Sequence, residues 1–449
     1  MSSDQSPPDA GRDPVADPYS VPPGGSYPPP AWEQPHHVPY HPWAGPPPSG
    51  RPPRHTSGVL ALATILAFVG GLLVGGVAVG VVWAVRSGSG EPSYEPAADM
   101  LPVELPRLIE FVERERELAF LEDVDIEVVD DDDFERALLV PVPEREGSGP
   151  LDHGSTYAAL GMTPDAATYY NGEFSAYTEY LVGFYDPEHT QMLIRGTDWT
   201  PDVEATVVHE LVHALQDQHF DIAAQLEDRD EDDEAALALR SIIEGDAARV
   251  EYAYIDEQDA QWQEAYDNAY LEAKPTGIYD PMADFVGWLP YWLGTTAVET
   301  LVEIGGNGVM NDVLRDPPTT SEQLLEIAEW HSGEEELRPA VDVEPPDVNG
   351  GAVLDRGTLG VAKISVLPLT FDDEFFPAEF ITGWRGDSYV TWRDGDRVCT
   401  TVAALFDDEA DVSAAVDMLQ DWAERTGGVL ESVDENPATP RLILESCTE

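Results

Sequence analysis

The chain has 449 residues, and 87 acidic against 23 basic residues give it a net charge of -64. Only Lys274 and Lys363 among the basic residues are lysines, so the chain lacks the concentrated basic surface that phosphate binding needs. We therefore expect no nucleic-acid partner, and the acidic surplus instead favours solubility.

The N-terminal part of the chain has two compositions. Residues 1–56 are rich in proline and cannot bury enough apolar surface to fold, which predicts a disordered cytoplasmic tail whose partner would be a proline-reading protein. Residues 57–86 carry no charge before Arg86, and they exceed the about 20 apolar residues that a bilayer crossing needs. This predicts a single uncleaved transmembrane anchor. Arg51 and Arg54 precede it, so the positive-inside bias places the N-terminus in the cytoplasm and the rest of the chain outside the cell membrane.

Beyond the anchor, residues 87–99 read as a flexible linker. The remaining stretch, roughly 350 residues, is long enough for one large domain or two. A Pro- and Gly-rich break at 344–351 divides it. We expect a main domain at 100–343 and a small α+β part at 350–449.

Several elements are predicted from periodicity and turn residues. A helix is expected at 106–120, a strand at 124–128, and a hairpin whose strands span 180–185 and 191–195. This hairpin is suited to be the sheet edge along which an extended peptide lies. The later elements are a helix at 234–258, strands at 389–392 and 398–405, and a helix at 410–425.

An HExxH motif begins at His209 and ends at His213. Residues four apart share one helical face, so two imidazoles can reach one Zn²⁺ ion, while Glu210 is placed to take a proton from the attacking water. The segment Thr200-Pro201-Asp202 has the pattern of a helix N-terminus, with a capping residue, a proline and an acid. A buried stripe on another side of the helix is predicted for Val208, Leu211, Val212 and Leu215.

Two residues compete to be the third zinc ligand. His219 lies six residues beyond His213, as in metzincins, but the glycine that ends the metzincin helix is replaced by Gln216. In a continuous helix, six residues place His219 about 120° around the axis and about 9 Å along it, too far to share the ion. Glu244 is favoured, because an acid followed by Gly245 within an apolar helix is unusual unless something approaches closely.

Cys399 and Cys447 are the only cysteines of the chain. An outward-facing domain meets an oxidising environment, so a disulfide between them is predicted. Their isolation in the sequence argues against a thiolate zinc site.

Three segments carry a resemblance to a known family: 213–221, Glu244-Gly245-Asp246-Ala247 and the 183–187 hairpin. They resemble the gluzincins, zinc metallopeptidases with an HExxH motif and a glutamate on a later helix, and most closely a group of bacterial secreted or membrane-anchored HExxH proteins. The likeness spans about residues 100–430 and includes 317–323 and 383–387.

The resemblance implies an α+β fold with a zincin-like catalytic domain. That domain contains a small sheet with an edge strand, the HExxH helix, the Glu helix and a helical lower part, and the small C-terminal α+β part follows it. The implied Zn²⁺ ligands are His209, His213 and Glu244, and the implied general base is Glu210.

The predicted function is a membrane-anchored extracytoplasmic zinc metallopeptidase that hydrolyses a peptide or protein substrate. The alternative is a membrane-tethered binding or scaffold protein whose zinc site is structural or vestigial. Candidates left open are Tyr252, Tyr254 and His331 for stabilising the carbonyl oxygen, and Asp217 or Asp246 for orienting a ligand imidazole.

Overall fold

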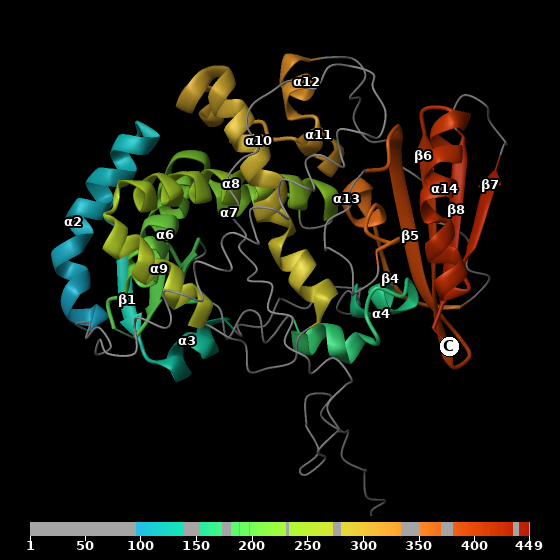
Figure 1. Ribbon diagram of the computed structural model, residues 1–449, viewed down its shortest axis with the longest axis horizontal. Helices are drawn as coiled ribbons and strands as arrows, with labels where there is room; N and C mark the ends of the chain where they lie inside the picture. The colour runs from blue at the N-terminus through green and yellow to red at the C-terminus, as the bar shows by residue number, and fades with distance from the viewer. Residues whose placement is uncertain are drawn as a thin grey trace, which may run out of the picture. The chain divides into compact units, whose positions relative to one another are not determined.

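The computed structural model describes residues 96–138, 153–172, 181–187, 189–196, 198–229, 233–272, 280–333, 351–369, 380–433 and 440–448. All of them belong to one compact unit, residues 89–449. They form an α+β fold with a three-stranded and a five-stranded sheet (Figure 1). The predicted tail, 1–56, and the predicted anchor, 57–86, lie outside the described residues, as does most of the predicted break at 344–351.

The expected transmembrane helix, and with it the membrane localisation, requires correction. None of the helices that the described residues form combines the length and the apolar character that a bilayer crossing needs. The longest of them, α10 (Pro281–Val313), is interrupted at Gly305 and Gly306 and carries acidic residues along its length. Its buried side chains pack into the protein core, so its apolar character serves folding.

The three-stranded sheet confirms the predicted strand and hairpin. It consists of β1 (Asp125–Val129), β2 (Gly183–Asp186) and β3 (Gln191–Arg195) in the order β1-β3-β2. β3 pairs in parallel with β1 and antiparallel with β2, so β2 is an edge strand. The short helix α3 (Asp131–Leu138) follows β1.

The helix predicted at 106–120 is wrong at both ends. α2 spans Ala97–Arg116, and its interior contains Pro102 and Pro106. The buried apolar residues of this helix, which include Leu101 and Phe111, outweigh the usual cost of an internal proline. The helix ends where Glu117 adopts a left-handed conformation with φ 52°.

Two long helices follow, and both confirm the predictions. α6 (Pro201–Phe220) carries the HExxH motif, and α8 (Asp233–Glu257) matches the helix expected at 234–258. The short α7 (Ile222–Glu227) joins them, and α9 (Ala260–Glu272) follows α8. α6, α2 and the three-stranded sheet share one hydrophobic core with part of α8.

α8 and α10 cross at two glycines. A side-chain carbon added to Gly294 would lie 1.8 Å from the backbone oxygen of Ser241, and one added to Gly245 would lie 2.4 Å from the backbone of Gly294. No other residue fits at so close an approach of two backbones. The close approach that Gly245 indicated in the sequence is therefore present, and it is made by α10.

The five-stranded sheet is antiparallel, in the order β4-β5-β6-β8-β7 (Figure 1). Its β5–β6 hairpin and its helix α14 confirm the predictions, and one face of α14 packs on the sheet through Val412, Leu419 and Trp422. The elements of this part are α4 (His153–Ala159), β4 (Ala352–Gly357), α13 (Gly360–Ile364), β5 (Trp384–Asp394), β6 (Arg397–Phe406), α14 (Glu409–Thr426), β7 (Val429–Val433) and β8 (Arg441–Cys447).

The segments 317–323 and 383–387, which are part of the sequence resemblance, make buried hydrogen bonds between elements of the fold. α11 (Ser321–Leu325) and α12 (Ile327–Ser332) follow α10, and both the backbone N–H and the hydroxyl of Ser321 donate to Glu234 at 2.8 Å. Asp387 accepts hydrogen bonds from the backbone of Leu359 and Gly360 at 2.9 Å. The backbone N–H of Ala362, in α13, donates to the Ser321 hydroxyl at 3.2 Å, and this bond joins the helical part to the segment held by the five-stranded sheet.

The predicted disulfide between Cys399 and Cys447 is confirmed. The two residues face each other in the antiparallel pair β6–β8, with a Cα–Cα distance of 4.0 Å. The bridge fixes the last strand of the sheet to its neighbour.

We expect the double substitution Cys399→Ser and Cys447→Ser to lower the free energy of unfolding by about 4 kcal/mol, because the bridge closes a loop with a sequence separation of 48. Urea unfolding followed by circular dichroism measures the change. Reduced wild-type protein is the matched control and should show the same loss. Equal stability with and without reductant would contradict the structural role of the bridge.

Candidate metal centre

The HExxH motif lies in the middle of α6, about two turns from either end. Thr200 is the N-cap residue, although its side chain makes no capping hydrogen bond, and Pro201 occupies the first turn. The predicted stripe of Val208, Leu211, Val212 and Leu215 is fully buried. Burial of this stripe against the core leaves the motif on another side of the helix, where it faces α8.

α8 supplies two carboxylates to His209. Its Nε2 lies 3.2 Å from Oε2 of Glu244, and its Nδ1 donates to Oε2 of Glu251 at 3.0 Å. Glu244 and Glu251 are seven residues apart, so they share one face of α8 two turns apart. Glu251 also accepts from the Tyr266 hydroxyl of α9 at 3.4 Å.

His213 converges on the same carboxylate oxygen. Its Nε2 lies 3.4 Å from Oε2 of Glu244, and its ring centroid is 4.8 Å from that of His209. On the other side of the ring, Nδ1 donates to Oε1 of Gln216 at 3.1 Å. Both imidazoles therefore have Nδ1 held by an acceptor and Nε2 directed at one point beside Glu244.

Glu210 is held by the edge strand of the three-stranded sheet. Its Oε2 accepts the backbone N–H of Tyr185, on β2, at 2.7 Å. A donor atom of each of His209, Glu210 and His213 lies within 4.8 Å of the others. The carboxylate is thus fixed between the sheet edge and the two imidazoles.

Tyr291 of α10 completes the group. Its ring centroid lies 6.1 Å from that of His209. Burial raises the pKa of Tyr291 well above its usual value, and the charges of Glu244 and Glu210 raise it further. The phenol is therefore a permanent proton donor beside the two carboxylates.

The structure does not bring the competing ligand to this group. α6 continues without a break through Phe220, and Nε2 of His219 donates to the backbone oxygen of Ala119 at 2.8 Å. The helix continues because Gln216 is an ordinary helical residue, which agrees with the argument from the missing glycine. Glu244, and not His219, is the residue that lies beside both imidazoles.

Other sequence candidates lie elsewhere. The Tyr254 hydroxyl bonds Glu204, and His331 is exposed on α12. Asp217 accepts from the Tyr185 hydroxyl at 3.0 Å and does not orient an imidazole, whereas Asp246 accepts from Nε2 of Gln216 at 3.0 Å. Of the two acids, Asp246 is the one connected to a predicted ligand.

The electrostatics of the group favour positive charge. Burial alone disfavours a charged imidazole, but hydrogen bonds to Glu244 and Glu251 outweigh it and raise the pKa of His209. The pKa of His213 is also raised against burial, by Glu244. Burial raises the pKa of Glu210, while the imidazoles hold the pKa of Glu244 well below its usual range despite burial.

The residues fit a divalent zinc ion. Donors at zinc bond lengths of 2.0–2.2 Å are separated by roughly 3.3–3.6 Å in a tetrahedron. Nε2 of His209 and Nε2 of His213 lie 3.2 and 3.4 Å from Oε2 of Glu244. With neutral imidazoles, Glu210, Glu244 and Glu251 leave three negative charges in a largely buried space, which a cation offsets. Two imidazoles and a carboxylate are a donor set of catalytic zinc.

Comparisons with protein-family models, with curated proteins and with solved structures give no match for this chain. The interpretation of the site therefore depends on its own geometry.

Sequence reasoning missed three residues of the site. Glu251 could have been predicted from the sequence, because it follows Glu244 by two helical turns and therefore lies on the same face of the helix. Gln216 follows His213 by one turn, but it was considered only for the glycine it replaces. Tyr291 has no local signal, since only the crossing of α8 and α10 brings it to Glu244.

We expect Glu244→Ala to weaken zinc binding by far more than the about 10- to 100-fold of a change outside the ligand set, because one of three protein ligands is lost. His219→Ala is the matched control and should retain the metal. Competition with a chromogenic chelator measures both affinities. A larger loss of zinc affinity in His219→Ala than in Glu244→Ala would mean that His219 is a ligand and Glu244 is not.

Proposed function

We propose that this protein is a zinc-dependent peptidase of gluzincin type. The observation that carries the proposal is the convergence of His209 and His213, through Nε2, on one oxygen of Glu244, with Glu210 beside them. The membrane anchor is not part of the proposal.

When bound, zinc supplies a Lewis acid that polarises a carbonyl and lowers the pKa of water from 15.7 toward about 7. His209, His213 and Glu244 would hold it. Glu210 then takes the proton of the attacking water and returns it to the leaving amine. The raised pKa of Glu210 suits this exchange, because it makes the carboxylate a stronger base toward the attacking water and a catalytic pKa is best placed near the operating pH.

The hydrogen bond from the Tyr185 backbone fixes one oxygen of Glu210 and leaves the other to face the substrate. β2 is an edge strand of the sheet, and an extended peptide can pair with such an edge through its backbone. This supports a polypeptide substrate, whose scissile bond would lie between the β2 edge and the two imidazoles.

Tyr291 is suited to stabilise the carbonyl oxygen of the scissile bond. Its phenol is a donor that stays protonated, and it lies beside Glu244. As the carbonyl oxygen becomes negative, this phenol can donate a hydrogen bond to it. A positioned donor of this kind acts on the transition state more than on the ground state.

Glu210→Gln is expected to leave zinc bound and to lower peptide hydrolysis by at least about 10²-fold, because the base is lost and no ligand is removed. The measurement combines metal analysis with cleavage of a peptide library by the full chain. Unchanged cleavage would end the proposal. Zinc binding by the wild-type protein without any cleavage would favour a binding or scaffold protein with a structural zinc site.

Tyr291→Phe is expected to lower kcat by about 10²- to 10³-fold while zinc affinity stays within a few-fold of wild type, because only the donated hydrogen bond is removed. Steady-state kinetics with a cleavable peptide and chelator competition give the two values. Tyr266→Phe, which loses a hydroxyl that contacts Glu251, is the control. A kcat close to wild type would exclude the proposed role of Tyr291.

A further inference from the structure

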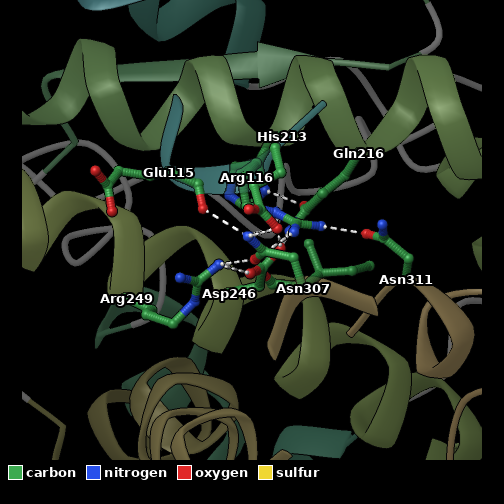
Figure 2. Close-up of polar contacts among 10 residues, drawn as sticks. Glu115, Arg116, His213, Gln216, Asp246, Arg249, Asn307 and Asn311 are labelled. Atoms are coloured by element: carbon green, nitrogen blue, oxygen red, sulfur yellow. Dashed lines mark hydrogen bonds and ion pairs between the residues drawn. The ribbon is translucent and has the colours of Figure 1, made fainter. Parts of the chain in front are cut away.

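A buried polar cluster lies directly behind His213, outside the proposed ligand set. Figure 2 shows this cluster, whose residues come from α2, α6, α8 and α10. Arg116 and Asp246 are fully buried and form an ion pair at 2.8 Å. Arg249 pairs with the other oxygen of Asp246 at 3.0 Å. The mechanism described above uses none of these charged groups.

α10 accepts three further hydrogen bonds from the two arginines. Asn307 accepts from Arg116 and from Arg249 at 3.0 Å, and Asn311 accepts from Arg116 at 3.0 Å (Figure 2). α10 presents these asparagines after its break at Gly305 and Gly306, where Gly306 has φ 65°. Side chains of α2, α8 and α10 thus fix the positions of the two guanidinium groups and of the Asp246 carboxylate.

Gln216 connects this cluster to His213 and has only one possible amide orientation. Its Nε2 lies 3.1 Å from the backbone oxygen of Ile243 and 3.0 Å from Oδ2 of Asp246. A carbonyl oxygen and an ionised carboxylate only accept, so the amide nitrogen must face them. Oε1 then faces Nδ1 of His213 at 3.1 Å.

The orientation of Gln216 determines which nitrogen of His213 is protonated. An amide oxygen can only accept, so Nδ1 of His213 must carry the proton. In the neutral imidazole that binds a metal, the lone pair then lies on Nε2, which is 3.4 Å from Glu244. A flipped amide would offer Nδ1 a donor and favour the tautomer that cannot bind through Nε2.

We propose that Gln216 and Asp246, with Arg116 behind them, are positioning residues that fix the metal-binding tautomer of His213. The proposal rests on the proposed zinc site and assigns Arg116 of α2 a role in it. Buried ion pairs add little stability by themselves, because desolvation offsets their attraction. Their charges instead fix the acceptor that Gln216 must face.

The test compares zinc affinity of the full chain in Gln216→Met, Asp246→Asn and the double variant. Gln216→Met has a similar volume and removes the acceptor of His213, so we expect affinity to fall about 10- to 100-fold. Gln218→Met is the matched control, because Gln218 lies on the same helix and bonds the backbone at Leu121 and Glu122. Its affinity should equal that of wild type.

Two further readouts separate positioning from general loss of stability. The absorption spectrum of the cobalt-loaded protein should change in Gln216→Met and stay unchanged in Gln218→Met, because only the first alters His213. Adding Asp246→Asn to Gln216→Met should cost no further affinity, since Asp246 acts through Gln216.

Equal zinc affinity and cobalt spectra in the Gln216 and Gln218 variants would overturn the proposal. Independent, additive losses from the Gln216 and Asp246 substitutions would also overturn it, because Asp246 would then act by another route. A wild-type chain that binds no zinc would overturn the proposed function itself, which is a separate outcome.

Discussion

The close crossing of α8 and α10 is the constraint on which the candidate site depends. Gly245 and Gly294 allow the two backbones to meet at a distance that no side chain permits. Glu244 precedes one of these glycines and Tyr291 is three residues before the other, so the crossing sets the carboxylate against the phenol. Gly245, next to the proposed ligand Glu244, is therefore needed both for the packing of the core and for the geometry of the site.

The same crossing explains why charge can be buried here. Asp246 follows Gly245 and faces the far end of α10, where Asn307 and Asn311 accept hydrogen bonds from the arginines that pair with it. On the other side of Gly245, Glu244 faces two imidazoles. Within one turn, α8 thus presents two carboxylates on different sides: Asp246 is neutralised by protein cations, and Glu244 would be neutralised by the proposed zinc ion.

Local patterns in the sequence predicted α6, α8, α14 and the β5–β6 hairpin, because helical and strand periodicity depend on neighbouring residues. Such patterns also placed Glu244 on a helix, where it meets the motif. The start of α2 was missed, because Pro102 and Pro106 argue locally against a helix that tertiary burial stabilises. Tyr291 and Arg116 could not be predicted, since their positions follow from how α10 and α2 pack.

The two proposed ligand imidazoles are held by acceptors of different charge. His209 donates to the carboxylate of Glu251, whereas His213 donates to the neutral amide of Gln216. A carboxylate on Nδ1 makes an imidazole a stronger electron donor. A carboxylate behind both rings would raise the negative charge around the ion and weaken its action as a Lewis acid. Gln216 avoids this, because the negative charge that orients it lies one residue further away, on Asp246, and is offset there by two arginines.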